Sequence, residues 1–272
     1  MKRNIIFGII FFLGLCIFLY PTVSNWMATR AHYSEISSYD ETVKSLEKEE
    51  IERRERAAKE YNKKVQSSTQ TFSDPFNEKN NQGKSYVDIL NLGEVMGYVE
   101  VPKINIKLPI YQGTSEKVLS RGIGRLEESS LPVGGESTHT VLTGHRGLPS
   151  AIMFTHLDKI EKGDMFYIHS LDKILVYKVD QIKTVLPNEI EDLVIVPNED
   201  YATLITCTPY GVNTHRLLVR GERVPNEAKE KEVVTKTPIL EEWMIIIPIA
   251  FLAFSVFVIF LVKRKQKKFK TL

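Results

Sequence analysis

The most apolar residues of the chain gather in two uninterrupted runs, at residues 5–20 and 243–262, and neither run contains a charged residue. Twenty helical residues rise about 30 Å, which is the thickness of the hydrocarbon core of a bilayer, so the second run can span a membrane. We predict a transmembrane anchor at residues 1–25, or alternatively a cleaved signal segment, and a transmembrane helix at residues 243–262.

Basic residues flank both runs on the side of the chain terminus. Lys2 and Arg3 precede the first run, and a basic tail at residues 263–272 follows the second. Such flanks stay on the cytoplasmic side of a membrane, so we expect both termini in the cytoplasm if the first run is retained. Residues 21–242 then lie on the extracellular face of the cell membrane.

A helical pattern opens the segment outside the membrane. Residues 34–66 contain no glycine or proline, and apolar residues recur every three or four positions, as at Ile36, Tyr39 and Val43. This pattern predicts a helix with a narrow apolar stripe, within an extracellular helical extension at residues 26–70. The stripe is equally typical of a helix packed on the following domain and of a solvated spacer.

Residues 85–225 consist of short β-type runs separated by turn residues. Many short strands without a βαβ rhythm indicate an all-β domain, an antiparallel barrel or sandwich, with short helices near residues 115–121 and 150–157. The charged stretch at residues 226–242 is interpreted as a tether. The expected strands are residues 98–101, 104–111, 138–142, 165–169, 174–185, 193–196, 201–207 and 216–224.

Net charge excludes one class of partner for this middle segment. The chain has 36 Lys and Arg residues against 34 Asp and Glu. Without the two basic residues of the first twenty positions and the six of the last thirty, 28 basic residues face 34 acidic ones, a net charge of −6. A nucleic-acid-binding domain carries the opposite sign, so we expect no nucleic-acid partner.

Two cysteines occur in the chain, and Cys16 lies inside the first apolar run. Cys207 is therefore a lone thiol in the domain outside the cell, where it is either a buried structural residue or a reactive one. If the runs that end at Cys207 and begin at Arg216 form a hairpin, the two residues face each other on strands ~4.8 Å apart. A cation there favours the thiolate or holds a developing oxyanion, although an ordinary hairpin with a surface arginine fits the same spacing.

A thiol nucleophile needs a proton carrier. His145 follows an expected strand in the glycine-flanked turn TGHRG at residues 143–147, so it is presented at a strand end as Cys207 is. His215, beside Arg216, is the competing candidate. The sequence has no CxxC pair, no HExxH motif and no phosphate-binding glycine loop, so we expect no metal site and no cofactor.

The polar stretch at residues 71–84 contains two aromatic residues, Phe72 and Phe76, which are not typical of a solvated linker. Pro75 stiffens the backbone and favours an extended conformation at Asp74. We predict a lid loop here, in which an aromatic side chain on a stiff segment covers an apolar or reactive group.

The motif TLITC at residues 203–207 resembles the TLxTC signature of the sortases, the cysteine transpeptidases of Gram-positive cell surfaces. The Asp-Pro-aromatic sequence of the lid loop and the second apolar run are similar to class C, the pilin-polymerising sortases. Three stretches resemble the same class in the family's order: LPVGG at 131–135, TGHRGLPSAIMF at 143–154 and TLITCTPYGVNTHRLLVRGER at 203–223.

The resemblance implies a closed eight-stranded β-barrel with Cys207 as nucleophile, His145 as general acid and base, and Arg216 as the group that positions substrate and oxyanion. Enzymes of this class cleave a Leu-Pro-x-Thr-Gly-like (LPxTG-like) signal of a pilin after Thr and form a thioacyl enzyme. A lysine amine of the next pilin resolves it as an isopeptide bond. The implied partners are pilin subunits with such a signal and an acceptor lysine.

The resemblance also implies roles outside the catalytic three. Asp74 pairs with the catalytic arginine, and Phe76, after Pro75, covers the thiol. The stretch GRLEE at residues 124–128 departs from relatives that carry His and Gly there. Substrate contacts are implied for Thr206, Leu131 and Pro132.

Two other functions fit the same sequence. One is a sortase that attaches surface proteins to peptidoglycan, and the other is a noncatalytic membrane-tethered adhesion or sensor module with the barrel as its binding domain.

Overall fold

The computed structural model describes residues 2–70, 72–77, 88–189 and 191–225. The tether expected at residues 226–242, the second transmembrane helix at 243–262 and the basic tail at 263–272 lie outside the described residues. So does most of the expected lid loop, at residues 71 and 78–84.

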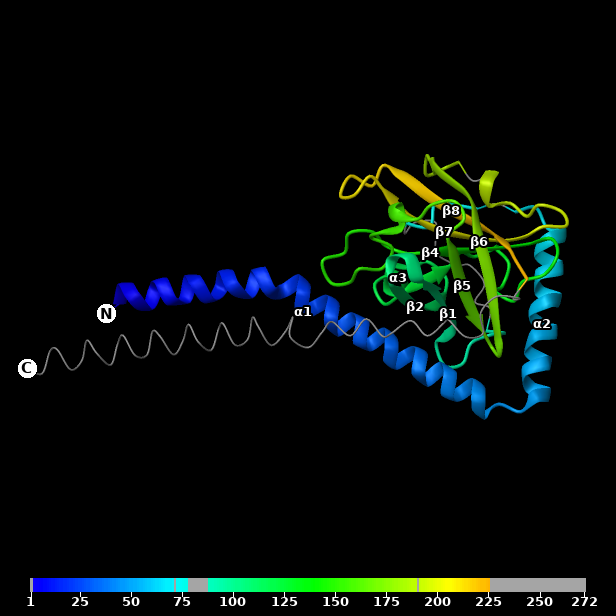
Figure 1. Ribbon diagram of the computed structural model, residues 1–272, viewed down its shortest axis with the longest axis horizontal. Coiled ribbons are helices and arrows are strands. Elements are labelled where there is room, and N and C mark those ends of the chain that lie inside the picture. Colours follow the sequence, from blue (N-terminus) through cyan, green and yellow to red (C-terminus); the bar gives the residue numbers. More distant parts are fainter. Residues whose placement is uncertain (1, 71, 78–87, 190, 226–272) are drawn as a thin grey trace, which may run out of the picture. The chain divides into compact units, whose positions relative to one another are not determined.

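Eight strands close into a β-barrel (Figure 1), and their order around the wall is β1-β2-β3-β4-β7-β8-β6-β5. The pairs β2–β3 and β4–β7 are parallel, and the other neighbours are antiparallel. The all-β class and the closed eight-stranded barrel are thus confirmed, but the sheet is mixed rather than antiparallel as expected from the strand pattern. The strands are β1 (Val95–Val101), β2 (Ile106–Gln112), β3 (Ile123–Arg125), β4 (Thr138–Thr143), β5 (Met165–Ser170), β6 (Lys173–Val185), β7 (Asp200–Thr208) and β8 (His215–Arg223).

Two expected elements were wrong, and one strand was not expected. Residues 193–196 are not a strand: a 3₁₀ turn, η4 (Glu191–Leu193), buries Leu193, and the following residues form a loop. Residues 150–156 are turns and irregular backbone rather than a helix, with Met153 at a φ of 42°, and the 3₁₀ turn η3 (Leu157–Lys159) begins at the last residue of the expected helix. The strand that completes the barrel is the three-residue β3, which follows the expected short helix α3 (Glu116–Leu119). A further 3₁₀ turn, η2 (Pro102–Ile104), joins β1 to β2.

The helical extension is packed on the barrel rather than solvated. Its residues belong to two helices, α1 (Lys2–Ser45) and α2 (Lys48–Ser67), because the helix expected over residues 34–66 is interrupted after Ser45. The stripe residues Ile36, Tyr39 and Val43 are buried in one cluster with Val95, Tyr98 and Tyr111 of the barrel. The Tyr39 hydroxyl also accepts a hydrogen bond from the Leu171 amide at 2.8 Å, which fixes α1 against the barrel wall.

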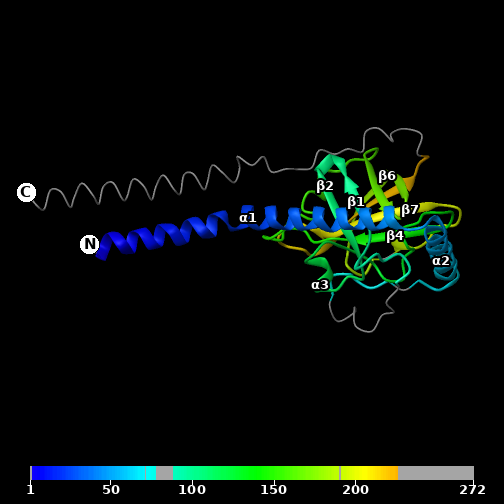
Figure 2. The ribbon, with the colours of Figure 1, turned by 90° about the horizontal axis from the view of Figure 1, so that it is seen from below.

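The helix from Ile6 to Ser45 contains a stretch long and apolar enough to cross a membrane, and none of that stretch is buried. Figure 2 shows this N-terminal part of α1 extending beyond the strands. A signal segment near an N-terminus has the same properties, so retention of the anchor stays a prediction.

The second helix, α2, binds the segment before β4 through hydrogen bonds between Asn62 and Leu131. Asn62 is 3% exposed, and its side-chain oxygen accepts from the Leu131 amide at 2.7 Å while its nitrogen donates to the Leu131 carbonyl at 3.1 Å. Both backbone groups of Leu131 are thereby satisfied under the helix, as buried polar groups require. This contact places residues 131–135 at the end of the barrel where β4 and β7 begin.

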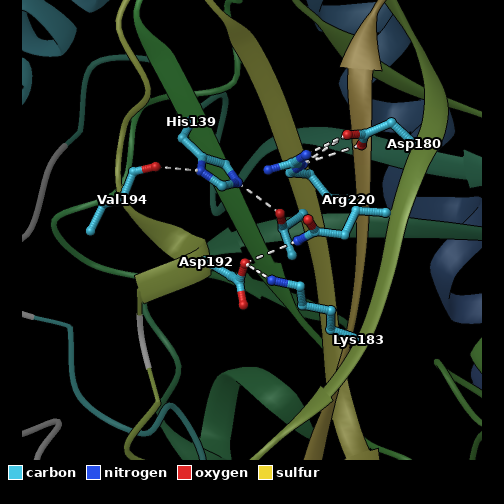
Figure 3. Close-up of polar contacts among 8 residues, drawn as sticks. His139, Asp180, Lys183, Asp192, Val194 and Arg220 are labelled. Carbon is cyan, nitrogen blue, oxygen red and sulfur yellow. Dashed lines mark hydrogen bonds and ion pairs between the residues drawn. The ribbon is translucent and has the colours of Figure 1, made fainter.

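A buried histidine connects the β6–β7 loop to the barrel wall (Figure 3). His139 of β4 lies 3.0 Å from the Val194 carbonyl through Nδ1 and 2.7 Å from the Thr203 hydroxyl through Nε2. A carbonyl can only accept, so Nδ1 donates to Val194 and Nε2 accepts from Thr203, as in a neutral imidazole. Two ion pairs lie near the imidazole of His139: Asp180 pairs with Arg220, and Asp192 pairs with Lys183.

This neutral imidazole predicts a pH dependence of stability. Burial lowers the pKa of His139 from 6.5 to about 4, so between those pH values the unfolded chain binds a proton that the folded chain excludes. The free energy of unfolding should therefore fall as the pH is lowered from 6.5 to 4, by up to about 3 kcal/mol from this residue, and level off below. Chemical denaturation of the detergent-solubilised chain at several pH values measures this free energy, and the same series on His139→Gln shows how much of its pH dependence comes from His139. If the free energy of unfolding of the variant fell as steeply with falling pH as that of the parent, His139 would not be the source of the pH dependence.

Candidate active site

The lone thiol and an arginine meet at the end of a hairpin. Cys207 of β7 lies directly opposite Arg216 of β8 in the antiparallel register, which confirms the pairing expected from the sequence. Cys207 is 6% exposed, and Arg216 is 8% exposed. The hairpin loop at residues 209–214 extends beyond both residues, so the pair lies at the rim of the barrel.

His145 reaches the same rim through the neighbouring strand. It follows β4 by two residues, and the Gly144 amide donates to the Ile205 carbonyl at 3.0 Å. The Gly144 carbonyl in turn accepts from the Thr206 hydroxyl at 2.7 Å, so the turn is fixed to β7 immediately before the thiol. Only glycine fits there, because a Cβ on Gly144 would lie 2.7 Å from the ring of Phe154.

The described part of the lid loop, residues 72–77, contacts the side chains of both Arg216 and His145. Asp74 accepts two hydrogen bonds from Arg216, at 2.8 Å from Nε and 2.7 Å from Nη2. The ring of Phe76 has its centroid 5.6 Å from that of His145 and 5.0 Å from Cζ of Arg216. Pro75 between them is buried, and Phe72 packs with Leu193 and Leu218 in an apolar cluster that anchors the segment.

In this closed arrangement the arginine has little capacity left to bind anything else. Besides the two bonds to Asp74, Nη1 donates to the carbonyls of Asn213 at 3.0 Å and His215 at 2.9 Å. Four of the five N–H groups of a guanidinium are then used. Departure of Asp74 would free two donors at once, in the fork geometry that suits a carboxylate or an acyl oxygen.

Burial raises the pKa of the Cys207 thiol, while the Arg216 cation acts in the opposite direction and the Asp74 carboxylate adds to the rise. Both the low polarity around the sulfur and the nearby anion disfavour a thiolate. With Asp74 in this position, the surroundings of the sulfur therefore favour the neutral thiol over the thiolate.

Glu116 is a site residue that the sequence analysis missed. It lies on α3, and its Oε2 is 3.1 Å from Nε2 of His145, so a protonated Nε2 donates to the carboxylate. A carboxylate in this position holds the imidazole ring in one orientation. No sequence signal could have found this contact, because the barrel brings together positions that are 29 residues apart.

The three residues assigned to substrate contacts do not line the site. Thr206 is fully buried, with its hydroxyl on the Gly144 carbonyl. Leu131 is fully buried and Pro132 is buried, at the opposite end of β4. At 3.3 Å per residue, the six positions from Tyr201, the partner of His139, to Cys207 span roughly 20 Å. The assignment of Leu131 and Pro132 is therefore corrected, and Thr206 instead supports the turn before His145.

His215, the competing histidine, pairs with Thr208 in the hairpin, and its Nδ1 lies 2.9 Å from the Thr214 hydroxyl. Phe76 contacts His145, so the imidazole under the lid is that of His145. No group of three metal-ligating side chains occurs within the described residues.

A family model described as the sortase domain matches residues 99–224. The crystal structure of a sortase C from Streptococcus pneumoniae, described with its pilin substrate specificity, is 51% identical and has a TM-score of 0.67. The match covers 71% of this chain and 97% of that one. Sortase C1 of the GBS Pilus Island 1 is 45% identical, with 74% and 96% covered and a TM-score of 0.69.

Curated relatives match over a shorter length. Sortase A of Streptococcus agalactiae is 30% identical over 131 residues, which is 47% of this chain and 52% of that protein. Sortase A of Bacillus anthracis is 28% identical over 141 residues, 52% of this chain and 65% of that protein. The chain thus matches between half and two thirds of the length of these two proteins.

Proposed function

The chain belongs to the sortase family and resembles its class C in structure, and from this premise we propose that it is a membrane-anchored cysteine transpeptidase that polymerises pili. One observation carries the proposal: Cys207, His145 and Arg216 converge at one rim of the barrel beneath an Asp-Pro-Phe lid. The solved relatives add support, since two of them are described in connection with pilin substrates or a pilus island.

The proposed first half-reaction cleaves an LPxTG-like sorting signal after its Thr. The sulfur of Cys207 attacks the Thr carbonyl carbon, and His145 receives the thiol proton. The developing oxyanion accepts hydrogen bonds from the Arg216 groups that Asp74 has vacated. When the C–N bond breaks, His145 protonates the departing Gly amine, and a thioester to Cys207 remains.

The second half-reaction transfers the acyl group to an amine. The neutral side-chain amine of a pilin lysine attacks the thioester carbonyl, His145 takes its extra proton, and the sulfur leaves to regain that proton. The product is an isopeptide bond, and the enzyme is unchanged. A site shielded from water favours the amine over hydrolysis while the thioester waits for its acceptor.

The membrane anchor would serve the same reaction. A sortase on the extracellular face and a pilin subunit held in the same bilayer meet at a raised effective concentration. We propose that the part of α1 within residues 1–25 is the retained anchor, that residues 85–225 are the catalytic domain, and that residues 71–84 form the lid loop.

Mass spectrometry of the full chain tests this function. The chain is incubated with a Leu-Pro-Xaa-Thr-Gly peptide library, then with purified pilin or with a peptidoglycan stem peptide as acceptor. We expect a Cys207 peptide that carries the donor through its Thr, followed by transfer to a pilin lysine. Transfer to the stem peptide alone would instead identify a sortase that attaches proteins to the cell wall. The absence of any adduct, also in Phe76→Ala, would favour the noncatalytic tethered module.

A further inference from the structure

The first contacts of α1 with the barrel are made by the loop that follows His145. The Ser24 hydroxyl donates to the Ser150 carbonyl at 3.4 Å, and the Asn25 side-chain oxygen accepts from the Ile152 amide at 3.0 Å. These two residues lie immediately after the apolar stretch of α1. The loop at residues 148–153 is therefore held against the helix where that stretch ends.

Later residues of α1 contact parts of the barrel progressively farther from the catalytic rim. His32 lies 2.8 Å from the Arg121 carbonyl, just after α3, and Tyr39 is bonded to the Leu171 amide on the β5–β6 turn. The turn to α2 follows at Ser45. A helix rises 1.5 Å per residue, so this order of contacts fixes which end of the barrel lies nearer to the apolar stretch. It is the end that carries the thiol.

The length of a membrane-spanning helix indicates which residues of α1 lie at the outer surface of the membrane. A span that begins at residue 5, where the apolar run begins, needs about 20 residues to cross the hydrocarbon core, so it ends near Ser24, two residues before Trp26. Trp26 itself carries the Arg30 guanidinium 5.6 Å above its ring. Tryptophan and arginine side chains are typical of the membrane–water interface. Ser24 and Asn25 then lie at the bilayer surface, and so does the loop bonded to them.

Apolar side chains project from this loop and from its neighbour. Ile152 is 40% exposed, and in the β7–β8 hairpin loop Tyr210 is 60% exposed and Val212 is 65% exposed. The two loops touch each other, because a Cβ on Gly147 would lie only 3.0 Å from the Tyr210 ring. Figure 1 shows both loops on the side of the barrel from which the N-terminal part of α1 extends, and Figure 2 agrees. Exposed apolar groups that gather beside a span indicate a surface for lipid.

We propose that the catalytic rim docks on the outer leaflet of the membrane, with the side chains of Ile152, Tyr210 and Val212 inserted at its interface. The partner is the lipid bilayer itself, and the proposal rests on the membrane span of α1. Docking turns the rim that carries Cys207 and His145 toward the bilayer. A sorting signal close to its own membrane anchor would then reach the thiol without the barrel having to tilt.

Lipid-quenching of single-cysteine reporters in the full chain tests this docking. In a Cys16→Ala, Cys207→Ala background, Val212→Cys and Ile152→Cys are each labelled with the NBD fluorophore and reconstituted into phosphatidylcholine–phosphatidylglycerol vesicles that contain doxyl-labelled lipid. The matched control is Glu136→Cys, which is exposed in the turn before β4 at the opposite end of the barrel. We expect at least twofold stronger quenching and a blue-shifted emission at positions 212 and 152.

A label on the native Cys16, in a Cys207→Ala chain, reports on the span separately. Strong quenching at Cys16 with equal, weak quenching at positions 212, 152 and 136 would overturn the docking and leave the exposed loops to a protein partner. Weak quenching at Cys16 would overturn the span and the docking with it. Neither result depends on catalysis, so each is distinguishable from a failure of the proposed transpeptidation.

Discussion

Replacement of Cys207 by alanine is expected to abolish covalent pilin ladders in surface extracts and to reduce peptide transfer at least about 10³-fold. The sulfur is the atom that would carry the acyl group, and no other thiol lies in the part of the barrel that the structure describes. The loss of one sulfur at a strand end removes little buried surface. Loss of activity would therefore reflect chemistry, which circular dichroism of the purified variant verifies.

The chain provides a matched control for this experiment in its other cysteine. Cys16 is exposed on the apolar part of α1, and Cys16→Ala makes the same chemical change outside the barrel. This control should retain ladder formation and peptide transfer. Persistent ladders in Cys207→Ala, in a strain without a second enzyme of this kind, would exclude Cys207 as the nucleophile.

The sequence predicted those parts of the fold in which local pattern and final environment agree. The strands β6, β7 and β8 are long enough for their pattern to show, and the residues between β7 and β8 are rich in turn formers. The run LVIV at residues 193–196 has the same apolar character, but its backbone bonds to His139 and Gln70 instead of to a strand. β3 has only three residues, too few for any period to be recognised.

The site divides in the same way. Cys207, His145 and Arg216 could be found because each lies beside a strand end with a turn next to it, and strand ends meet at the rim of a barrel. Glu116 could not be found, since its contact with His145 depends on the path of the chain around the barrel. The substrate contacts implied for Leu131 and Pro132 of the LPVGG stretch did not match the structure, because similarity identifies a segment without showing whether it packs under a helix or lines a groove.

The ion pair between Asp74 and Arg216 leads to the second prediction, which concerns the rate at which the Cys207 thiol is alkylated. Asp74→Asn should accelerate alkylation of Cys207 by a small reagent such as iodoacetamide, by about tenfold or more at pH 7.5. Hydrogen bonds to a charged group contribute about 1.5–3 kcal/mol, so their weakening would raise the open fraction of the lid by one to two orders of magnitude. The same substitution removes an anion that raises the pKa of the Cys207 thiol, so the thiolate fraction rises as well.

Asp180→Asn is the control for this substitution. Asp180 pairs with Arg220, four residues beyond Arg216 on β8, and is not part of the lid. It should leave the alkylation rate unchanged, whereas Phe76→Ala should raise it because the ring over His145 and Arg216 is gone. Equal rates in the parent, Asp74→Asn and Phe76→Ala would show that the segment at residues 74–76 does not limit access to the thiol. Acceleration in both lid variants but not in Asp180→Asn would show that the segment at residues 74–76 limits access of small reagents to the thiol, as a lid requires.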